Sequence, residues 1–192
     1  MTEKTALIIN GAEIHRPAAS GRLNTLLFET LQQELKLSHT VLTTVLQDGY
    51  DVAIEQQKFH KADLIIFQTP IFWFSLPSSF KRYIDVVYKY GIFFGPSSQY
   101  GRGGLLTGKT YFLSSTWNAK STDFELASGF LGERTPDDLL VSFHLTQQYV
   151  GLQQLVSFSE YDVVAKPDPD GAVKRLKQHL QKHIVGRQAM HR

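Results

Sequence analysis

The order of hydrophobic and polar positions predicts a chain in which short strands alternate with helices. Apolar runs predict strands at residues 5–10, 40–46, 64–67, 109–116 and 155–158. Apolar positions at helical spacing predict helices at residues 23–35, 51–60, 78–90, 137–150 and 172–184. The third strand segment, 64–67, is continuously apolar rather than alternating, which is expected when helices cover both faces of a parallel sheet.

This alternation proceeds without an internal repeat or a linker, so it predicts one α/β domain over residues 1–192. Residues 185–192 are expected to form a loose C-terminal tail. A five-stranded parallel sheet with helices on both faces and a ligand site at its switch point corresponds to the flavodoxin-like arrangement.

Three consecutive aromatic residues, Phe72, Trp73 and Phe74, follow the third predicted strand. Pro70 and Pro77 flank them, so this segment is predicted to continue neither as strand nor as helix. Three neighbouring rings in a loop cannot all point into a core, and loops after parallel strands bind ligands in open α/β sheets. The segment therefore predicts a site for a planar ring, with a hydrophobic dimer interface as the alternative.

The loop after the first strand is a candidate phosphate site. Ser20 is predicted to cap the following helix, which leaves the N–H groups of Gly21 to Asn24 at its positive end. His15 and Arg22 add positive charge nearby. The loop contains neither a dinucleotide-binding glycine fingerprint nor a P-loop, so these two classes lose support, and an ordinary connection is the alternative.

The segment after the fourth strand completes the candidate site. Thr116 and Asn118 flank Trp117 and offer a hydroxyl and an amide to the edge of a heteroaromatic ring. Because the carboxyl ends of parallel strands share one edge of a sheet, the loops after the first, third and fourth strands are expected to converge there. The glycines that follow Tyr100 are predicted to let the backbone approach a ligand, with a flexible lid as the alternative.

Composition narrows the function classes further. The chain has 192 residues, of which 42% are hydrophobic and 20% charged, and it lacks cysteine, which excludes disulfide and thiolate chemistry. A net charge of +2 is too small to indicate nucleic acid, and no apolar run is long enough to insert into a membrane. A cytoplasmic location is expected. No hydrolase elbow or metal-ligand spacing occurs, so a bound cofactor is expected to supply the chemistry.

Several motifs together resemble the NAD(P)H:quinone oxidoreductases, and most of all their modulator of drug activity B subgroup. These motifs are Asn10-Gly11-Ala12, Gly21-Arg22-Leu23-Asn24, Gln68-Thr69-Pro70 with Trp73, Lys81-Arg82-Tyr83-Ile84-Asp85, Tyr100-Gly101 with Gly103-Gly104-Leu105, Thr116-Trp117-Asn118-Ala119, and Phe143-His144 with Gln148 and Gly151. The resemblance extends over residues 7–163, and its most specific part is the Thr-Trp-Asn-Ala motif.

The resemblance implies a homodimer that binds FAD rather than FMN and reduces quinones by two electrons, in a ping-pong hydride transfer from NADPH or NADH. No protein side chain acts as a nucleophile in that scheme. Two alternatives have the same fold: an FMN-dependent azo- or nitroreductase, and a flavin-binding ancillary subunit of a potassium efflux system. The basic final helix, whose simpler interpretation is a solvated face, is compatible with a peripheral contact to such a membrane partner.

Carried over by position, the resemblance also implies the site residues. The cofactor contacts are His15, Ser20, Gly21, Arg22, Leu23, Asn24, Thr25, Pro70, Ile71, Phe72, Trp73, Phe74, Tyr100, Thr116, Trp117, Asn118 and Ala119. The substrate pocket combines Phe72, Trp73, Tyr100 and His144, and no metal is expected. Backbone N–H groups of residues 70–74 and 116–119 are expected to face the flavin edge. Ile71 departs from the family pattern, since glycine is expected there, and residues 91–99 form a shorter stretch than in the subgroup.

Overall fold

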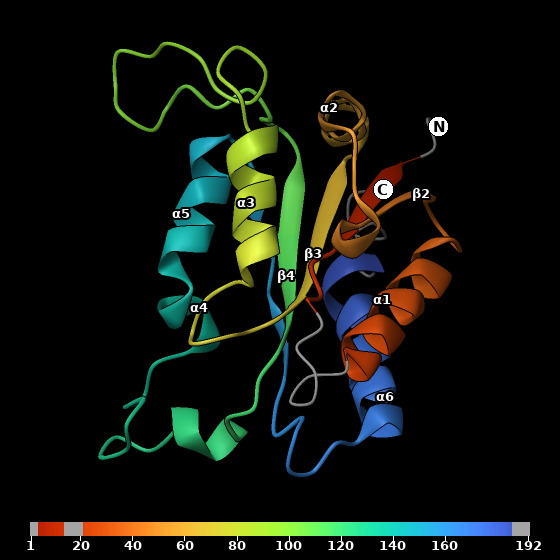
Figure 1. Cartoon of the computed structure of the whole chain (residues 1–192), viewed down its shortest axis with the longest axis vertical. Helices are drawn as coiled ribbons and strands as arrows, with labels where there is room; N and C mark the ends of the chain where they lie inside the picture. Colours follow the sequence, from red (N-terminus) through yellow and green to blue (C-terminus); the bar gives the residue numbers. More distant parts are fainter. Residues whose placement is uncertain (1–3, 14–20, 186–192) are drawn as a thin grey trace.

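The computed structural model describes residues 4–13 and 21–185, which form a parallel sheet between two helical layers (Figure 1). The strands are β1 Thr5–Asn10, β2 Thr40–Val45, β3 Leu64–Pro70, β4 Thr110–Thr116, β5 Gln153–Gln154 and β6 Phe158–Glu160. The α-helices are α1 Arg22–Leu35, α2 Val52–Lys61, α3 Ser78–Val87, α4 Pro136–Leu139, α5 Val141–Tyr149 and α6 Pro169–Leu180. Single helical turns cover Leu46–Asp48, Ser121–Phe124 and Gln181–Val185.

The strands follow the order β2-β1-β3-β4-β5, β6 also pairs with β4, and every pairing is parallel. Along β1, Leu7 and Ile9 face the layer of α2, α3 and α5, whereas Ala6 and Ile8 face the layer of α1 and α6 (Figure 1). All four side chains are fully buried, which explains why β1 is apolar on both of its faces. The flavodoxin-like α/β fold is confirmed.

Two predicted elements differ from the observed ones. The predicted strand at 155–158 is divided into β5 and β6, which pair with the two ends of β4 and leave Leu155 to Ser157 between them. The predicted helix at 137–150 is interrupted at Leu140, whose φ of −103° and ψ of 23° end α4 before α5 begins. In both segments the apolar residues keep the same spacing across the interruption. The sequence pattern therefore gave no indication of either interruption.

A buried carboxylate joins the second strand to two helices. Glu55 of α2 is 1% exposed and accepts hydrogen bonds from the Thr44 hydroxyl (2.7 Å) and the Tyr83 hydroxyl (2.6 Å). Lys58 donates to its other oxygen at 2.7 Å. A buried charge with three partners is satisfied rather than orphaned, so it fixes α2 and α3 against the sheet. Asp51 caps α2 as predicted, since its side chain accepts from the Ile54 N–H at 2.9 Å.

The two ends of the sheet receive different loops. The loops after β1, β3 and β4 lie at its carboxyl edge, whereas the segment 91–104 lies at the opposite end of the molecule (Figure 1). The glycines of that segment serve the chain itself: a Cβ on Gly103 would lie 2.2 Å from the Gly95 carbonyl oxygen, and one on Gly104 would lie 2.3 Å from the Gly151 nitrogen. They therefore permit close backbone packing, and the prediction that they approach a ligand receives no support from this chain.

Within the described parts of the chain, no helix has the length and apolar character needed to cross a membrane. No cluster of three potential metal-ligating side chains occurs among those residues either.

His179 of α6 is expected to make stability depend on pH. Its Nε2 lies 3.0 Å from the Val156 carbonyl oxygen, which can only accept, and burial, followed by the proximity of His183, lowers the pKa of His179 to about 4. An unfolded histidine has a pKa of about 6.5. Between these values the unfolded chain binds a proton that the folded chain excludes, so the free energy of unfolding falls as the pH decreases through this window.

The variant His179→Gln should therefore show a smaller drop in its urea midpoint between about pH 7 and pH 5 than the parent protein. Exposed His60 offers a matched control, because His60→Gln should keep the parental slope. Equal slopes for the parent and His179→Gln would contradict the prediction.

Candidate functional site

Three buried amide side chains connect the elements that meet at the carboxyl edge. Asn10, at the end of β1, accepts hydrogen bonds through its Oδ1 from the Ala12 N–H at 3.0 Å and from the Asn24 amide of α1 at 2.7 Å. The Gln68 amide of β3 donates to Asn24 Oδ1 at 2.9 Å. The three side chains are 4%, 3% and 0% exposed. This amide network, Asn10–Asn24–Gln68, fixes the start of α1 against two strands.

One acceptor of the amide network has no partner in the described structure. The Oε1 atom of Gln68 is buried and makes no hydrogen bond. Buried polar atoms are rarely left without a partner unless a ligand or a water occupies the position. The unpaired Gln68 oxygen therefore marks a place where a donor group is expected.

Gly11 allows the loop after β1 to lie directly on the core. Its N–H donates to the Gln68 carbonyl at 2.8 Å, and a Cβ at this position would lie 2.3 Å from the Phe80 ring. Phe80 is fully buried at the start of α3. The close approach of ring and backbone thus explains why glycine is required here.

The aromatic segment after β3 forms a tight turn that projects its rings outward. The Ser75 N–H donates to the Phe72 carbonyl at 3.0 Å, and Phe72 N–H donates back to the Ser75 carbonyl at 2.9 Å. The two central residues, Trp73 and Phe74, have φ values of 50° and 61° and are 94% and 43% exposed. We call residues 72–75 the aromatic turn. Its left-handed backbone at two large side chains costs about 1–2 kcal/mol per residue, a kind of strain that clusters at functional sites.

Several backbone N–H groups of the predicted ring site are already used within the fold. Pro70 has none, the Ile71 N–H donates to the Thr116 carbonyl at 3.0 Å, and the Trp117 N–H donates to the Glu160 carbonyl at 2.8 Å. The expectation that all of these loops direct N–H groups at a ring edge is therefore too broad. Among the described backbone hydrogen bonds of the aromatic turn, the Trp73 and Phe74 N–H groups have no acceptor, so they remain available.

The hydrogen bond from the Ile71 N–H to the Thr116 carbonyl explains why isoleucine occupies a position where glycine was expected. Ile71 continues the pairing of β3 with β4, and its side chain is half-buried against the core layer of α3 and α5. A β-branched residue suits such an extended, half-buried position. Ile71 thus acts as an anchor for the aromatic turn.

The motif after β4 lies at the carboxyl edge, but its tryptophan belongs to the core. Trp117 is 2% exposed, donates from Nε1 to the Ser115 hydroxyl at 2.8 Å and packs edge-on against Phe124. Thr116 is also buried, Ala119 is half-buried, and Asn118 is exposed. The predicted contact through this motif therefore concerns its backbone and Asn118, while the indole stabilises the loop.

The N-terminus of α1 has no side-chain cap among the described residues. Gly21 occupies the N-cap with a φ of 71°. Ser20, the predicted cap, and His15 lie outside the described residues. In the first turn Arg22 and Thr25 are exposed and Leu23 is half-buried. Uncapped N–H groups at a helix N-terminus form a favourable site for an anion.

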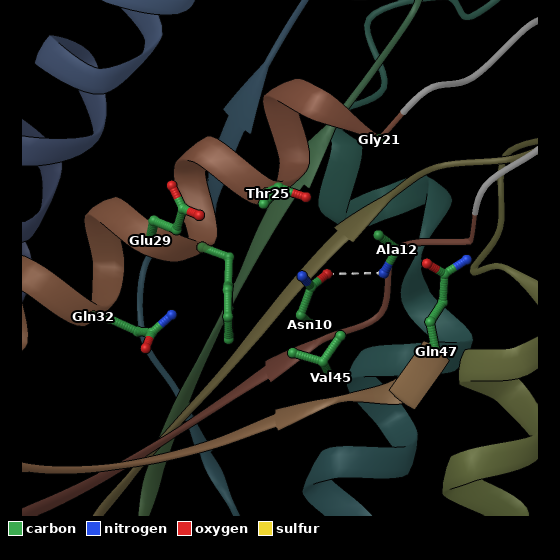
Figure 2. A pocket seen from close by; sticks show the side chains of 9 residues that line it. Asn10, Ala12, Gly21, Thr25, Glu29, Gln32, Val45 and Gln47 are labelled. Atoms are coloured by element: carbon green, nitrogen blue, oxygen red, sulfur yellow. Dashed lines mark hydrogen bonds between the residues drawn. The ribbon is translucent and has the colours of Figure 1, made fainter. Parts of the chain in front are cut away.

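A cavity of about 250 Å³ extends from this N-terminus along α1 toward the end of β2 (Figure 2). Its lining comprises Asn10, Ala12, Gly21, Thr25, Phe28, Glu29, Gln32, Val45 and Gln47. Figure 2 shows Thr25, Glu29 and Gln32 on the α1 side and Val45 and Gln47 on the opposite side. Polar side chains at both sides, with the amide network at one end, make the cavity suitable for a polar ligand.

Two residues predicted for the substrate pocket lie elsewhere in this chain. His144 of α5 is 5% exposed, with its Nδ1 3.0 Å from the Tyr111 hydroxyl and its Nε2 3.2 Å from Asp137 Oδ1. Burial raises the pKa of Tyr111, so this phenol stays neutral and can donate to His144. Although burial opposes it, contacts with His144 and Ser157 hold the pKa of Asp137 below its usual value. His144 thus lies between the buried Tyr111 hydroxyl and the partly exposed carboxylate of Asp137.

Tyr100 lies in the segment 91–104 at the other end of the sheet. Its ring is 93% exposed and its centroid lies 5.6 Å from that of Tyr149, at the end of α5. Tyr100 borders a cavity of about 730 Å³, and Asp85 and Tyr88, at the C-terminal end of α3, line the same cavity. The aromatic turn, in contrast, lies before the N-terminal end of α3. Tyr100 therefore does not reach the aromatic turn of its own chain.

One aromatic residue beside the turn was not predicted. The Phe130 ring centroid lies 5.7 Å from that of Phe74, and Phe130 is 85% exposed. It lies in a polar connection without periodicity, so only its position between Gly129 and Gly132 could have distinguished it.

Comparisons with known sequences show the family of this chain. The sequence model of a family described as "Flavodoxin-like fold" matches residues 4–184. "NADPH:quinone oxidoreductase MdaB" from Haemophilus influenzae is 35% identical over 173 residues, which cover 84% of this chain and 90% of that protein.

Solved structures show the same fold. A putative quinone reductase from Klebsiella pneumoniae has a TM-score of 0.72 at 24% identity and covers 94% of this chain and 84% of its own. General stress protein 14 from Treponema denticola, in complex with FMN, has a TM-score of 0.69 at 22% identity and covers 97% of this chain and 98% of its own.

The contact between Gly11 and Phe80 gives a direct test of how the site is built. Gly11→Ala should lower the free energy of unfolding by about 1–3 kcal/mol, because the added methyl overlaps a buried ring. Urea denaturation measures the loss, and adding Phe80→Leu should restore part of it by making room.

Gly95→Ala is the matched control, since a Cβ at Gly95 would meet nothing within 4 Å. A Gly11→Ala protein as stable as the Gly95→Ala protein would show that the loop after β1 does not rest on Phe80.

Proposed function

Because the chain belongs to the flavodoxin-like NAD(P)H:quinone oxidoreductase family, we propose that it is an FAD-dependent enzyme that reduces quinones by two electrons with NADPH or NADH. The observation that most supports this proposal is the aromatic turn. Two large rings are exposed on a strained backbone at the carboxyl edge, beside a helix N-terminus without a described side-chain cap. A cytoplasmic location, where nicotinamide cofactors are available, agrees with this function.

The residues at the edge fit a flavin. The first turn of α1 suits its phosphate, and Trp73 and Phe74 offer apolar faces with N–H groups that make no described hydrogen bond. When bound, the flavin would supply the transfer of two electrons from a nicotinamide to a quinone.

The protein's part is positioning and electrostatics. The Asn10–Asn24–Gln68 network holds the start of α1 at a fixed place beside β1 and β3, so phosphate and ring sites keep their spacing. Arg22 and the partial positive charge of the helix end favour an anion there. Preorganised N–H groups at Trp73 and Phe74 would stabilise negative charge at a ring edge by a few kcal/mol each.

FAD is proposed over FMN because of the cavity along α1. Its space of about 250 Å³ begins at the first turn of α1, where the phosphate site is proposed, and farther along it Glu29, Gln32 and Gln47 offer polar groups to a second nucleotide half. The fold also accepts the smaller flavin, as the FMN complex of the Treponema denticola protein illustrates. FMN is therefore the alternative cofactor, and flavin extraction must distinguish it from FAD.

We also propose a homodimer that pairs the exposed faces of α3 and α5. Val141 and Leu145 of α5 are 54% and 58% exposed, and the cavity of about 730 Å³ lies between these helices and the segment 91–104. Tyr100 cannot reach the aromatic turn of its own chain, so the predicted contact requires the partner copy.

Flavin extraction from the purified protein, followed by chromatography, tests the proposed function directly. We expect FAD, and we expect rapid NADPH or NADH oxidation when a quinone is added. Light scattering of the same sample should give the mass of a dimer. FMN as the extracted flavin would overturn the FAD assignment. A protein with bound flavin that leaves quinones unreduced would favour the regulatory alternative.

Paired variants of Trp73 separate the ring from the backbone strain. Trp73→Ala and Trp73→Gly both remove the indole, so both should weaken flavin retention or turnover, by about 2- to 10-fold for one aromatic contact. Because glycine adopts positive φ without strain, Trp73→Gly should be about 1 kcal/mol more stable to urea than Trp73→Ala.

The outcome for Trp73 also tests the dimer alternative for the aromatic turn. A Trp73→Ala protein that keeps its flavin and its turnover but becomes monomeric would show that the turn is first of all an interface.

A further inference from the structure

Phe130 is a large ring that the fold leaves in solvent beside the aromatic turn. It is 85% exposed, and its ring lies at 43° to the Phe74 ring with centroids 5.7 Å apart. Phe74 itself is 43% exposed and Trp73 is 94% exposed. Phe74 and Phe130, which come from two separate loops, thus form one exposed apolar surface, and such surfaces usually mark a binding site.

The connection after β4 holds Phe130 in this place. The next residue, Leu131, is 5% exposed in the core, and the Arg134 side chain donates to the Leu131 carbonyl at 2.9 Å. Gly129 closes the preceding turn through its N–H to the Leu126 carbonyl at 2.8 Å. The turn at Gly129 and the buried Leu131 thus anchor the chain on both sides of Phe130, while the Phe130 side chain itself stays in solvent.

The topology places Phe130 at the end of the site farthest from the phosphate position. Strands β1, β3 and β4 are neighbours in this order, and α1, the aromatic turn and Phe130 follow them in the same order. Two strand spacings separate β1 from β4, or about 10 Å. A ligand anchored at the α1 N-terminus would meet the aromatic turn first, so Phe130 borders the space on its outer side.

We infer that Phe130 and Phe74 form the wall against which the aromatic electron acceptor packs, and that Phe130 determines the preference for ring-shaped acceptors. This inference rests on the proposed function for the identity of the acceptor as a quinone. Phe130 provides a flat apolar surface and no proton or charge. Its removal should therefore weaken acceptor binding, while the cofactor and the chemical step stay unchanged.

The test compares Phe130→Ala and Phe130→Tyr in the flavin-loaded protein. Calorimetric titration of the oxidised protein with 1,4-naphthoquinone-2-sulfonate measures acceptor binding without turnover. Phe130→Ala should raise the dissociation constant about 2- to 10-fold, the range of one aromatic pair. Phe130→Tyr keeps the ring and should bind as the parent does. The KM for the quinone should rise by the same factor at constant kcat, and turnover with ferricyanide, which has no ring, should stay the same.

Leu37→Ala is the control for loss of an exposed apolar side chain, since Leu37 is 82% exposed just after α1, away from the carboxyl edge. Unchanged quinone binding by Phe130→Ala would overturn the inference. A loss of bound flavin in Phe130→Ala would overturn it too, because the ring would then belong to the cofactor site. A parent protein that binds the quinone but does not reduce it would refute the proposed function alone, and the binding comparison would still decide the role of Phe130.

Discussion

The Asn10–Asn24–Gln68 network is the constraint on which the site depends. Three amides, each nearly inaccessible to solvent, connect the end of β1, the first turn of α1 and the end of β3. Polar groups so deeply buried must satisfy one another, since each unpaired one costs about 1–3 kcal/mol. They therefore fix the position of the helix N-terminus relative to the aromatic turn, which follows β3 two residues later. The single unsatisfied oxygen, on Gln68, lies within this rigid framework.

In the aromatic turn, in contrast to the amide network, some backbone N–H groups have no partner in the described structure. Its outer bonds, Ile71 to Thr116 and Phe72 to Ser75, use the N–H groups that would otherwise compete for a ligand. Among the described hydrogen bonds, the two N–H groups of the turn that have no acceptor belong to its two residues with left-handed backbone. Strain and unsatisfied donors thus coincide at Trp73 and Phe74, where the side chains are also most exposed. A structure selected for stability alone would place glycine or asparagine at such positions.

The sequence was sufficient for the fold and for the edge that contains the site. Continuous apolar strands and amphipathic helices determine the layers, and the convergence of the loops after β1, β3 and β4 follows from parallel pairing alone. The burial of Trp117 and the location of Tyr100 could not be predicted in this way. Both depend on tertiary packing: Trp117 packs on Phe124, and Tyr100 belongs to a segment that returns to the amino end of β4. Similarity of motifs assigns a residue to a site. It does not show whether the side chain or the backbone makes the contact, or whether the contact comes from a second copy of the chain.

Phe130 illustrates how a recognition surface arises from residues without a pattern of their own. Its side chain is exposed although its neighbour Leu131 is buried, and its ring contacts Phe74, which follows the adjacent strand β3. The contact with Phe74 is not visible within ten residues of either ring. The ends of adjacent strands hold their loops about 5 Å apart, so a loop of irregular sequence can bring a ring to a partner that lies more than fifty positions earlier. In a family whose cofactor supplies the chemistry, such loop residues offer a way for acceptor preference to change while the amide network and the flavin-binding edge stay constant.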